Sequence, residues 1–170
     1  MSERGAGRRD GEDEGFLARW RGHEAEYLDC LRAAVASAEG DWRESLRAAA
    51  WESVRWAEAD PAAARFLTVD ALAMGERGQV CQRRLTARLM GMLEGWLRES
   101  EVTPPPGLAR WVLGLFYASF HRHLAVGDVE RLADVVPQLL FLAVSPVCGV
   151  EAALAELETG PPQSPGRFHP

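Results

Sequence analysis

Two stretches near the C-terminus decide the fold: LARWVLGLFYASFHRHL at residues 108–124 and VERLADVVPQLLFLAV at residues 129–144. At about 100° per residue, their apolar side chains spread well beyond the roughly 100° stripe that a surface helix buries. In the first stretch, only Arg110, Tyr117 and His121 line a polar strip. Each helix therefore has apolar surface on two sides that has to be buried. Its own domain can bury one of these sides.

The second stretch leaves only a few polar side chains for water, namely Glu130, Asp134, Gln138 and the following Ser145. The remaining cover is most economically the same pair of helices from a second copy, because closed two-fold homodimers are the commonest soluble assembly. We therefore predict a homodimer. Its predicted interface residues are Trp111, Val112, Leu115, Leu139, Leu142 and Ala143.

The composition is that of one soluble domain, with 170 residues, 47% of them hydrophobic, and a net charge of -6. This charge opposes unaided binding to nucleic acid. The longest apolar runs fall short of the roughly 20 residues of a membrane span, and no apolar run follows the charged N-terminus. We expect a cytoplasmic protein without membrane association. Cys30, Cys81 and Cys148 lie far apart, which favours reduced thiols.

Helical periodicity organises the chain between two predicted disordered tails, residues 1–15 and 159–170. Asp41 with Glu44 resembles a capping box, and Asp60-Pro61 is a second helix start. Pro137 should kink the last long helix or delay its start. No stretch alternates with period two, so residues 16–158 are predicted to form an all-α bundle of about six helices. The expected helices cover residues 16–38, 41–59, 61–75, 76–99, 108–124 and 129–144, with a further segment from Ser145-Pro146 to residue 158.

No catalytic or metal-binding pattern occurs in the sequence. It has no Gly-rich phosphate loop, no nucleophile elbow, no paired cysteines and no helical His-Glu-His pattern. His121 and His123 are two residues apart, so on a helix they point to different sides and do not chelate one metal. We therefore expect neither enzymatic activity nor a cofactor or metal.

Two carboxylates occupy apolar helix faces, where they must be paired, hydrated or neutral. Glu24 lies in the arc formed with Tyr27 and its apolar neighbours, and Asp70 lies among apolar residues of the short third helix. Each is interpreted either as an internal brace or as part of a ligand cavity. For Glu24, the brace would be an ion pair with Arg88 or Arg55.

Several aromatic residues carry the same ambiguity. Trp51 lies opposite the inner face of its own helix and would wall a pocket if that helix were central. Phe116, Tyr117 and Phe120 are core residues or the lining of an apolar ligand cavity. The predicted ligand-binding set is Glu24, Tyr27, Trp51, Asp70, Phe116, Tyr117 and Phe120.

Three segments resemble the regulatory domain of TetR-type transcriptional repressors: GDWRESLRAAAWESVRWAEADPAAARFLTVDALAMG at 40–75, GLARWVLGLFYASFHRHLAVGD at 107–128 and LADVVPQLLFLAVSPVCGVEAA at 132–153. The resemblance implies an all-helical effector-binding fold that dimerises through its last two long helices. It also implies that ligand binding moves the first helix, here residues 16–38.

That family begins with a three-helix DNA-binding head, which has no counterpart in this sequence. Either the protein is a headless relative, or the head belongs to a longer chain that begins before residue 1. The segment EDEGFLARW at 12–20 resembles the sequence that follows such a head. We therefore expect a sensor of a small, mostly apolar molecule that does not bind DNA by itself. The alternative is an interaction protein that forms heterodimers with a full-length relative. A small helical enzyme with an unfamiliar site is the third possibility.

Overall fold

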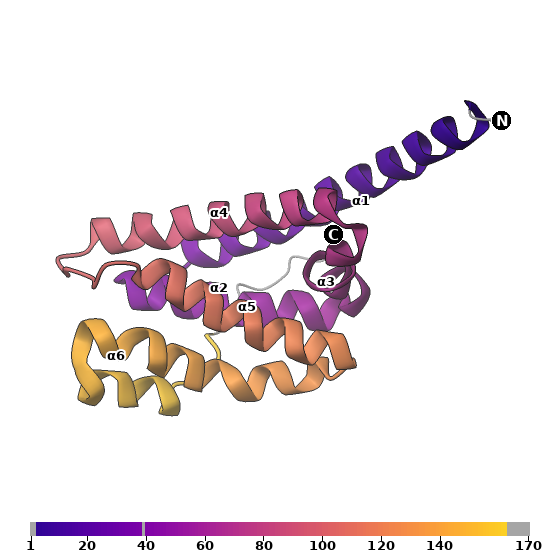
Figure 1. The fold of residues 1–170 in the computed structure, drawn as a ribbon. Helices are drawn as coiled ribbons and strands as arrows, with labels where there is room; N and C mark the ends of the chain where they lie inside the picture. The colour runs from indigo at the N-terminus through magenta and orange to yellow at the C-terminus, as the bar shows by residue number, and fades with distance from the viewer. Residues whose placement is uncertain (1–2, 39, 163–170) are drawn as a thin grey trace.

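The structure is a computed structural model that describes residues 3–38 and 40–162. Over these residues it is an all-α bundle without strands, as the sequence predicts. The helices are α1 (Glu3–Ala36), α2 (Trp42–Ala59), α3 (Pro61–Thr68), α4 (Glu76–Glu99), α5 (Leu108–Val126) and α6 (Leu132–Glu158), with short 3-10 helices η1 (Asp70–Met74) and η2 (Val129–Arg131). Figure 1 shows α1 and α4 on one side of the bundle and α6 on the other, with α2 and α5 between them.

Helix α2 is the central helix and packs against α1, α3, α4 and α6. Its start is fixed by Asp41, whose side chain accepts a hydrogen bond of 2.8 Å from the backbone N–H of Arg43 and so satisfies one of the free N–H groups of the first turn. Buried residues lie on both faces of the helix, including Leu46 and Trp51. From the sequence, Trp51 was expected inside the protein only if its helix were central. Helix α2 meets this condition, because neighbouring helices cover both of its faces.

The chain from α3 to α4 turns sharply. Asp60 caps α3 by accepting a 2.9 Å hydrogen bond from the N–H of Ala63. Gly75, with φ 65°, separates η1 from α4. In the first turn of α4, a Cβ on Gly78 would stand 1.6 Å from the carbonyl oxygen of Ala71. Only glycine therefore permits this close approach of η1 to α4.

Helix α5 ends at Gly127, whose left-handed φ of 77° is the usual termination of a helix at glycine. Arg65 of α3 donates to the carbonyl oxygens of Leu124 and Ala125, at 2.9 Å each. These carbonyls belong to the last turn of α5, where backbone donors become scarce; that of Leu124 also accepts from the N–H of Gly127 at 3.3 Å. The guanidinium thus links the end of α5 to α3.

Helix α6 differs from prediction in where it bends. The expected break at Ser145-Pro146 is absent, and the non-helical backbone inside α6 is at Gly149, with φ 83° and ψ 165°. The prolines inside α6, Pro137 among them, are not where the helix is interrupted. A residue without a Cβ adopts this backbone with little strain, whereas Pro146 tolerates helical φ. The predicted final segment is thus the last part of α6.

Among the described residues, one helical stretch, Val129–Glu158, is long and apolar enough by length and composition to cross a membrane, which the sequence analysis did not expect. The core helix of a soluble protein meets the same two criteria. Here 28% of the apolar window is buried. Val136, Leu140 and Val144 are completely buried in the core of the bundle, and the helix is interrupted at Gly149.

The N-terminus is the clearest correction to the predicted organisation. Residues 1–15 were expected to be disordered, but α1 begins at Glu3, and Asp13 forms an ion pair with Arg77 of α4. Once Phe16 and Trp20 anchor α1 in the core, each added residue gains a backbone hydrogen bond without a new nucleation cost. Figure 1 shows these first turns projecting beyond the bundle. Of the predicted C-terminal tail, residues 159–162 are non-helical and the rest lie outside the described residues.

Candidate functional site

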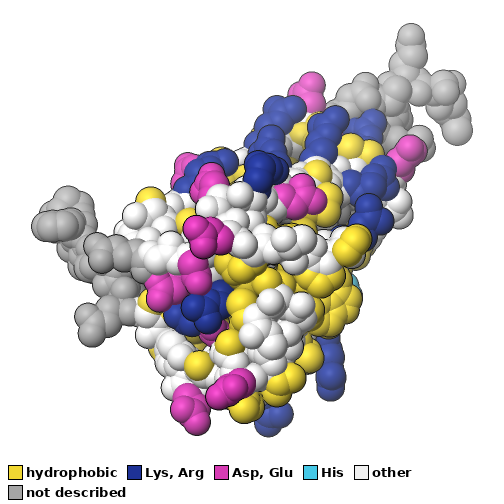
Figure 2. Space-filling model, turned by 90° about the vertical axis from the view of Figure 1, so that its left-hand side faces the viewer, with side chains coloured by type: hydrophobic (Ala, Val, Ile, Leu, Met, Phe, Trp, Pro, Cys, Tyr) yellow, Lys and Arg dark blue, Asp and Glu magenta, His cyan; other side chains and the backbone are white. Residues whose placement is uncertain are grey.

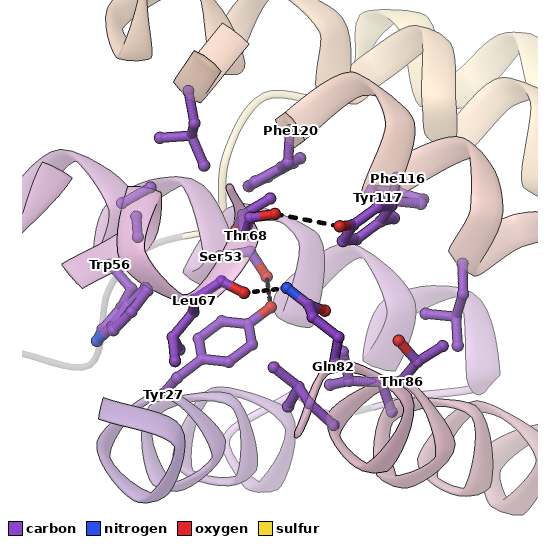
Figure 3. Close-up of a pocket in the computed structure, with 16 residues that line it drawn as sticks. Tyr27, Ser53, Trp56, Leu67, Thr68, Gln82, Thr86, Phe116, Tyr117 and Phe120 are labelled. Atoms are coloured by element: carbon purple, nitrogen blue, oxygen red, sulfur yellow. Dashed lines mark hydrogen bonds between the residues drawn. The ribbon is translucent and has the colours of Figure 1, made fainter. Parts of the chain in front are cut away.

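A cavity of about 100 Å³ lies among α1, α2, α3, α4 and α5 (Figure 3). None of its lining residues carries a formal charge, so the cavity offers no ionic partner to a ligand. The lining residues are Tyr27, Ser53, Trp56, Ala57, Ala64, Leu67, Thr68, Gln82, Leu85, Thr86, Leu89, Leu113, Phe116, Tyr117, Phe120 and Leu124.

Aromatic rings form much of the wall. Phe116 and Phe120 are four residues apart on α5, so they share one face of that helix, and Tyr117 stands beside Phe116. On the opposite side, the ring of Tyr27 from α1 packs against that of Trp56 from α2, with 4.9 Å between the ring centroids and an angle of 44° between the ring planes. The Nε1 of Trp56 is buried, has no hydrogen-bond partner among the described residues, and points away from the cavity in Figure 3.

Three hydrogen bonds tie the polar side chains of the cavity to its walls. The hydroxyls of Tyr27 and Ser53 are 2.9 Å apart, and the hydroxyl of Tyr117 donates to the carbonyl oxygen of Thr68 at 3.1 Å. The Gln82 amide donates to the carbonyl oxygen of Leu67. Figure 3 shows the Tyr27 hydroxyl and the Gln82 amide directed toward the middle of the cavity.

The two phenols of the cavity are neutral, because the ordinary pKa of 10.0 is already well above pH 7 and burial raises the pKa further. Burial raises the pKa of Tyr27, and the hydrogen bond with Ser53 offsets part of this effect. Burial also raises the pKa of Tyr117. Both side chains are therefore protonated at neutral pH, and the arrangement as a whole is suited to an uncharged molecule with a large apolar surface.

Four of the seven predicted ligand-binding residues lie at this cavity, namely Tyr27, Phe116, Tyr117 and Phe120. Aromatic residues with helical spacing are usually core residues. Here they border a cavity that residues of five helices line together.

The structure places Glu24 in an internal brace instead. Its Oε2 accepts from Nε1 of Trp20 at 3.1 Å, and its Oε1 accepts from Arg88 of α4, also at 3.1 Å. Arg88 is one of the two partners that the sequence suggested for Glu24. The pair links α1 to α4 one helical turn away from Tyr27.

Asp70 and Trp51 also lie away from the cavity lining. The carboxylate of Asp70 in η1 accepts from Nε of Arg65 at 3.1 Å. Both side chains are more than two-fifths exposed, so this ion pair lies at the surface and is not the internal brace that the sequence analysis offered as the alternative. Trp51 is buried, and its Nε1 has no hydrogen-bond partner among the residues that the structure describes.

Sequence reasoning missed the polar residues of the cavity. Ser53 of α2 was not singled out, and neither were Gln82 and Thr86, which are four residues apart on α4. The available signal was a polar pair with helical spacing beside the apolar stripe that contains Cys81 and Leu85. A buried Gln82 has to satisfy its amide, and it does so at the C-terminal turn of α3.

The six predicted interface residues divide into two groups. Trp111 and Leu142 are 44% and 40% exposed, and Leu115 is partly exposed, so these three present apolar surface. Val112, Leu139 and Ala143 are buried within the chain itself and have almost no area left to offer a partner. Their faces of α5 and α6 pack inward, which the sequence could not distinguish from an outward face because both faces are apolar.

The His pair on α5 does not form a metal cluster. The Nδ1 of His123 lies 2.9 Å from the carbonyl oxygen of Ser119, within its own helix. No group of three or more His, Cys, Asp or Glu residues suited to a metal ion occurs in the described part of the chain.

Comparison with known proteins gives no matching family model, no match among curated proteins and no match among solved structures.

Proposed function

We propose that this protein is a TetR-like effector-binding and dimerisation domain that senses a small, mostly apolar molecule in the cytoplasm. The observation that carries the proposal is the uncharged, aromatic-walled cavity among five helices. An ionised ligand would lose its hydration there without gaining a charged partner, whereas an apolar ligand replaces empty space with contacts.

The cavity also has a physical route to the rest of the molecule. Tyr27 of α1 borders it directly, and Glu24, one turn earlier, holds α1 to Arg88 of α4. A ligand that shifts the ring of Tyr27 therefore acts on the helix that, in the similar family, leads to the DNA-binding head. Direct operator binding by this chain alone is not part of the proposal, because its net charge is -6.

The dimer is supported by apolar surface that the chain leaves open. Trp111 of α5 and Leu142 of α6 are each at least two-fifths exposed, and these two helices pack against each other. Figure 2 shows one end of the bundle, where apolar side chains are concentrated toward the lower right and Arg and acidic side chains lie above and below them. Exposed apolar side chains that cluster on one face are typical of a protein interface.

Ligand binding is tested with toluene, a neutral molecule with one aromatic ring. We expect toluene to raise the unfolding midpoint at constant protein concentration, because it binds only the folded state. Phe120→Trp places a larger ring at the cavity and should abolish the increase. Phe141→Trp makes the same change in a half-buried residue of α6 outside the cavity and should preserve it. An unchanged midpoint in the wild type would refute ligand binding.

Dimerisation is tested by sedimentation of Leu142→Arg. The variant should sediment as a monomer at concentrations where the wild type is a dimer, because a buried, unpaired guanidinium opposes association. Val126→Arg is the matched control, since Val126 is 76% exposed at the end of α5 and outside the predicted interface. A wild type that stays monomeric at high concentration would exclude the homodimer, and binding to lipid vesicles would assign the apolar face of α6 to a membrane.

The second candidate is capture of a full-length TetR-type relative through the same surface. The exposed Trp111 and Leu142 favour it as much as they favour a homodimer, because neither residue specifies an identical partner. Native mass spectrometry of this chain mixed with such a relative distinguishes the two. Mixed dimers with one copy of each chain would support capture, whereas persistent separate homodimers would contradict it.

A further inference from the structure

The hydrogen atoms of the cavity hydroxyls can be assigned from their partners. The Oγ of Ser53 lies 2.8 Å from the carbonyl oxygen of Ala49, which can only accept, so Ser53 donates its single hydrogen there. The hydroxyl of Tyr27, 2.9 Å from the same Oγ, must then be the donor in the second contact. The Oη of Tyr27 has no hydrogen left and can offer a ligand only its lone pairs.

The orientation of the Gln82 amide follows from the same reasoning. Its partner, the carbonyl oxygen of Leu67, accepts but cannot donate, so the NH₂ group of Gln82 faces Leu67 and Oε1 is turned away from it. Leu67 lies in the last turn of α3, where carbonyl groups lack an intrahelical donor. Figure 3 shows Oε1 directed toward the side of the cavity that Thr86 and Tyr117 border. It is a second acceptor.

The other polar groups are already bonded or reach water. Tyr117 donates its hydroxyl hydrogen to Thr68. Thr86 is exposed to solvent, where water can serve it as donor or acceptor. Gln82 keeps a second amide hydrogen beside its acceptor Oε1, so of the two groups directed toward the middle of the cavity the Oη of Tyr27 is the one that can only accept.

The size of the cavity sets the scale of the ligand. Its volume is about 100 Å³, and an apolar cavity of about 150 Å³ in another protein holds benzene. The cavity is therefore somewhat smaller than one aromatic ring requires, but its lining residue Thr86 is exposed to solvent, so a one-ring molecule is the upper limit and would extend toward that side.

We propose that the cavity selects a neutral, one-ring aromatic molecule bearing a hydroxyl or N–H donor, and that this donor bonds to the Oη of Tyr27, whose own hydrogen is committed to Ser53. The proposal rests on the function proposed above for the same cavity. It adds the direction of the hydrogen bond. A ligand that only accepts would face the lone pairs of Tyr27 and leave them unpaired, which costs affinity.

The test uses phenol, anisole and toluene, which share one ring and differ in being a donor, an acceptor only, and neither. Affinities are measured by isothermal titration and by ligand-observed NMR. Tyr27→Phe should lower the affinity for phenol by about two- to tenfold, because one hydrogen bond is lost, and should leave the affinity for toluene unchanged. The variant itself is checked for folding by circular dichroism.

The sharper variant is Ser53→Ala, which removes the acceptor for the Tyr27 hydrogen and frees that hydrogen for a ligand. Anisole should gain affinity relative to toluene in this variant, by about two- to tenfold. Ser45→Ala is the control, because Ser45 is on the same helix but outside this cavity. It should change neither the affinity for phenol relative to toluene nor the affinity for anisole relative to toluene.

Two results would overturn the inference while leaving the proposed function intact: toluene binds, but phenol binds equally well to the wild type and to Tyr27→Phe, or anisole gains nothing in Ser53→Ala. If none of the three probes binds the wild type, the cavity is not a ligand site, and the inference and the proposed function fall together.

Discussion

Replacing Arg47 should destabilise the fold more than replacing its partner Glu156. The two side chains form a bidentate ion pair, with Nε to Oε2 at 3.0 Å and Nη2 to Oε1 at 2.8 Å. They are 109 residues apart in the sequence and link central helix α2 to the last part of α6. The side chain of Glu156 is 1% exposed, whereas that of Arg47 is 17% exposed.

This difference in burial sets the magnitudes. Arg47→Met leaves a carboxylate almost completely buried without its partner, and breaking a buried pair in this way costs about 3–5 kcal/mol of unfolding free energy. Glu156→Gln keeps an acceptor of the same shape and leaves a guanidinium that reaches water, so we expect about 1–3 kcal/mol. In a chain of this size, each kcal/mol lowers the unfolding midpoint by about 2–4 °C.

The assay is urea unfolding followed by circular dichroism, at one fixed protein concentration because association alters apparent stability. The double variant Arg47→Met/Glu156→Leu completes a thermodynamic cycle. It should lose less than the sum of the single variants, because no buried charge remains unpaired. Additive losses, or a larger loss for Glu156→Gln than for Arg47→Met, would refute the reasoning.

Two further predictions use the backbone and the alkaline titration. Gly78→Ala should lower the free energy of unfolding by more than about 1 kcal/mol, because the new Cβ collides with the Ala71 carbonyl. Gly91→Ala on the same helix has open space around its Cβ and should raise the free energy of unfolding by about 0.5–1 kcal/mol. Equal midpoints of the two variants in urea would contradict this. The pKa of Tyr27 is raised above its ordinary value of 10.0, so its contribution to stability is complete below about pH 10 and is lost as the pH rises through the folded pKa. Tyr27→Phe should therefore reduce the loss of stability at alkaline pH more than Tyr117→Phe does, since Tyr117 is the more exposed of the two. The chain has no lysine, so few other groups titrate in this range. Phenolate absorbance measures the ionisation of the tyrosines.

Helix positions were predictable because their signals are local. Asp41 and Asp60 start α2 and α3 where the capping patterns placed them, and α4 covers the residues expected of it. The bend of α6 was not predicted correctly, because proline is the stronger local signal for a break although Gly149 carries the positive φ. The N-terminal extension of α1 was missed because its stability comes from the packed turns that follow, not from its own composition.

The cavity could be predicted only in part, because a cavity depends on how far apart helices lie and not on the pattern within one helix. Phe116 and Phe120 were identified from their spacing, but whether they meet a neighbour or empty space depends on α1 and α4. Polar residues such as Gln82 become informative only when their partners are known, as the carbonyl of Leu67 is here.

The cavity and the apolar face of α5 and α6 are connected through α5 itself. Phe116 and Phe120 turn toward the cavity, while Trp111 and Leu115, on the same helix, present apolar surface on the outside. Because an α-helix is nearly rigid over a few turns, a ligand that displaces the backbone of α5 at Phe116 also displaces the outer face of this helix. If both proposals hold, ligand affinity and dimer affinity are therefore coupled, and the coupling is reciprocal. Leu142→Arg, which acts only on the dimer, should then change the affinity for toluene even though Leu142 lies outside the cavity, and an affinity identical to that of the wild type would show that the two sites are independent.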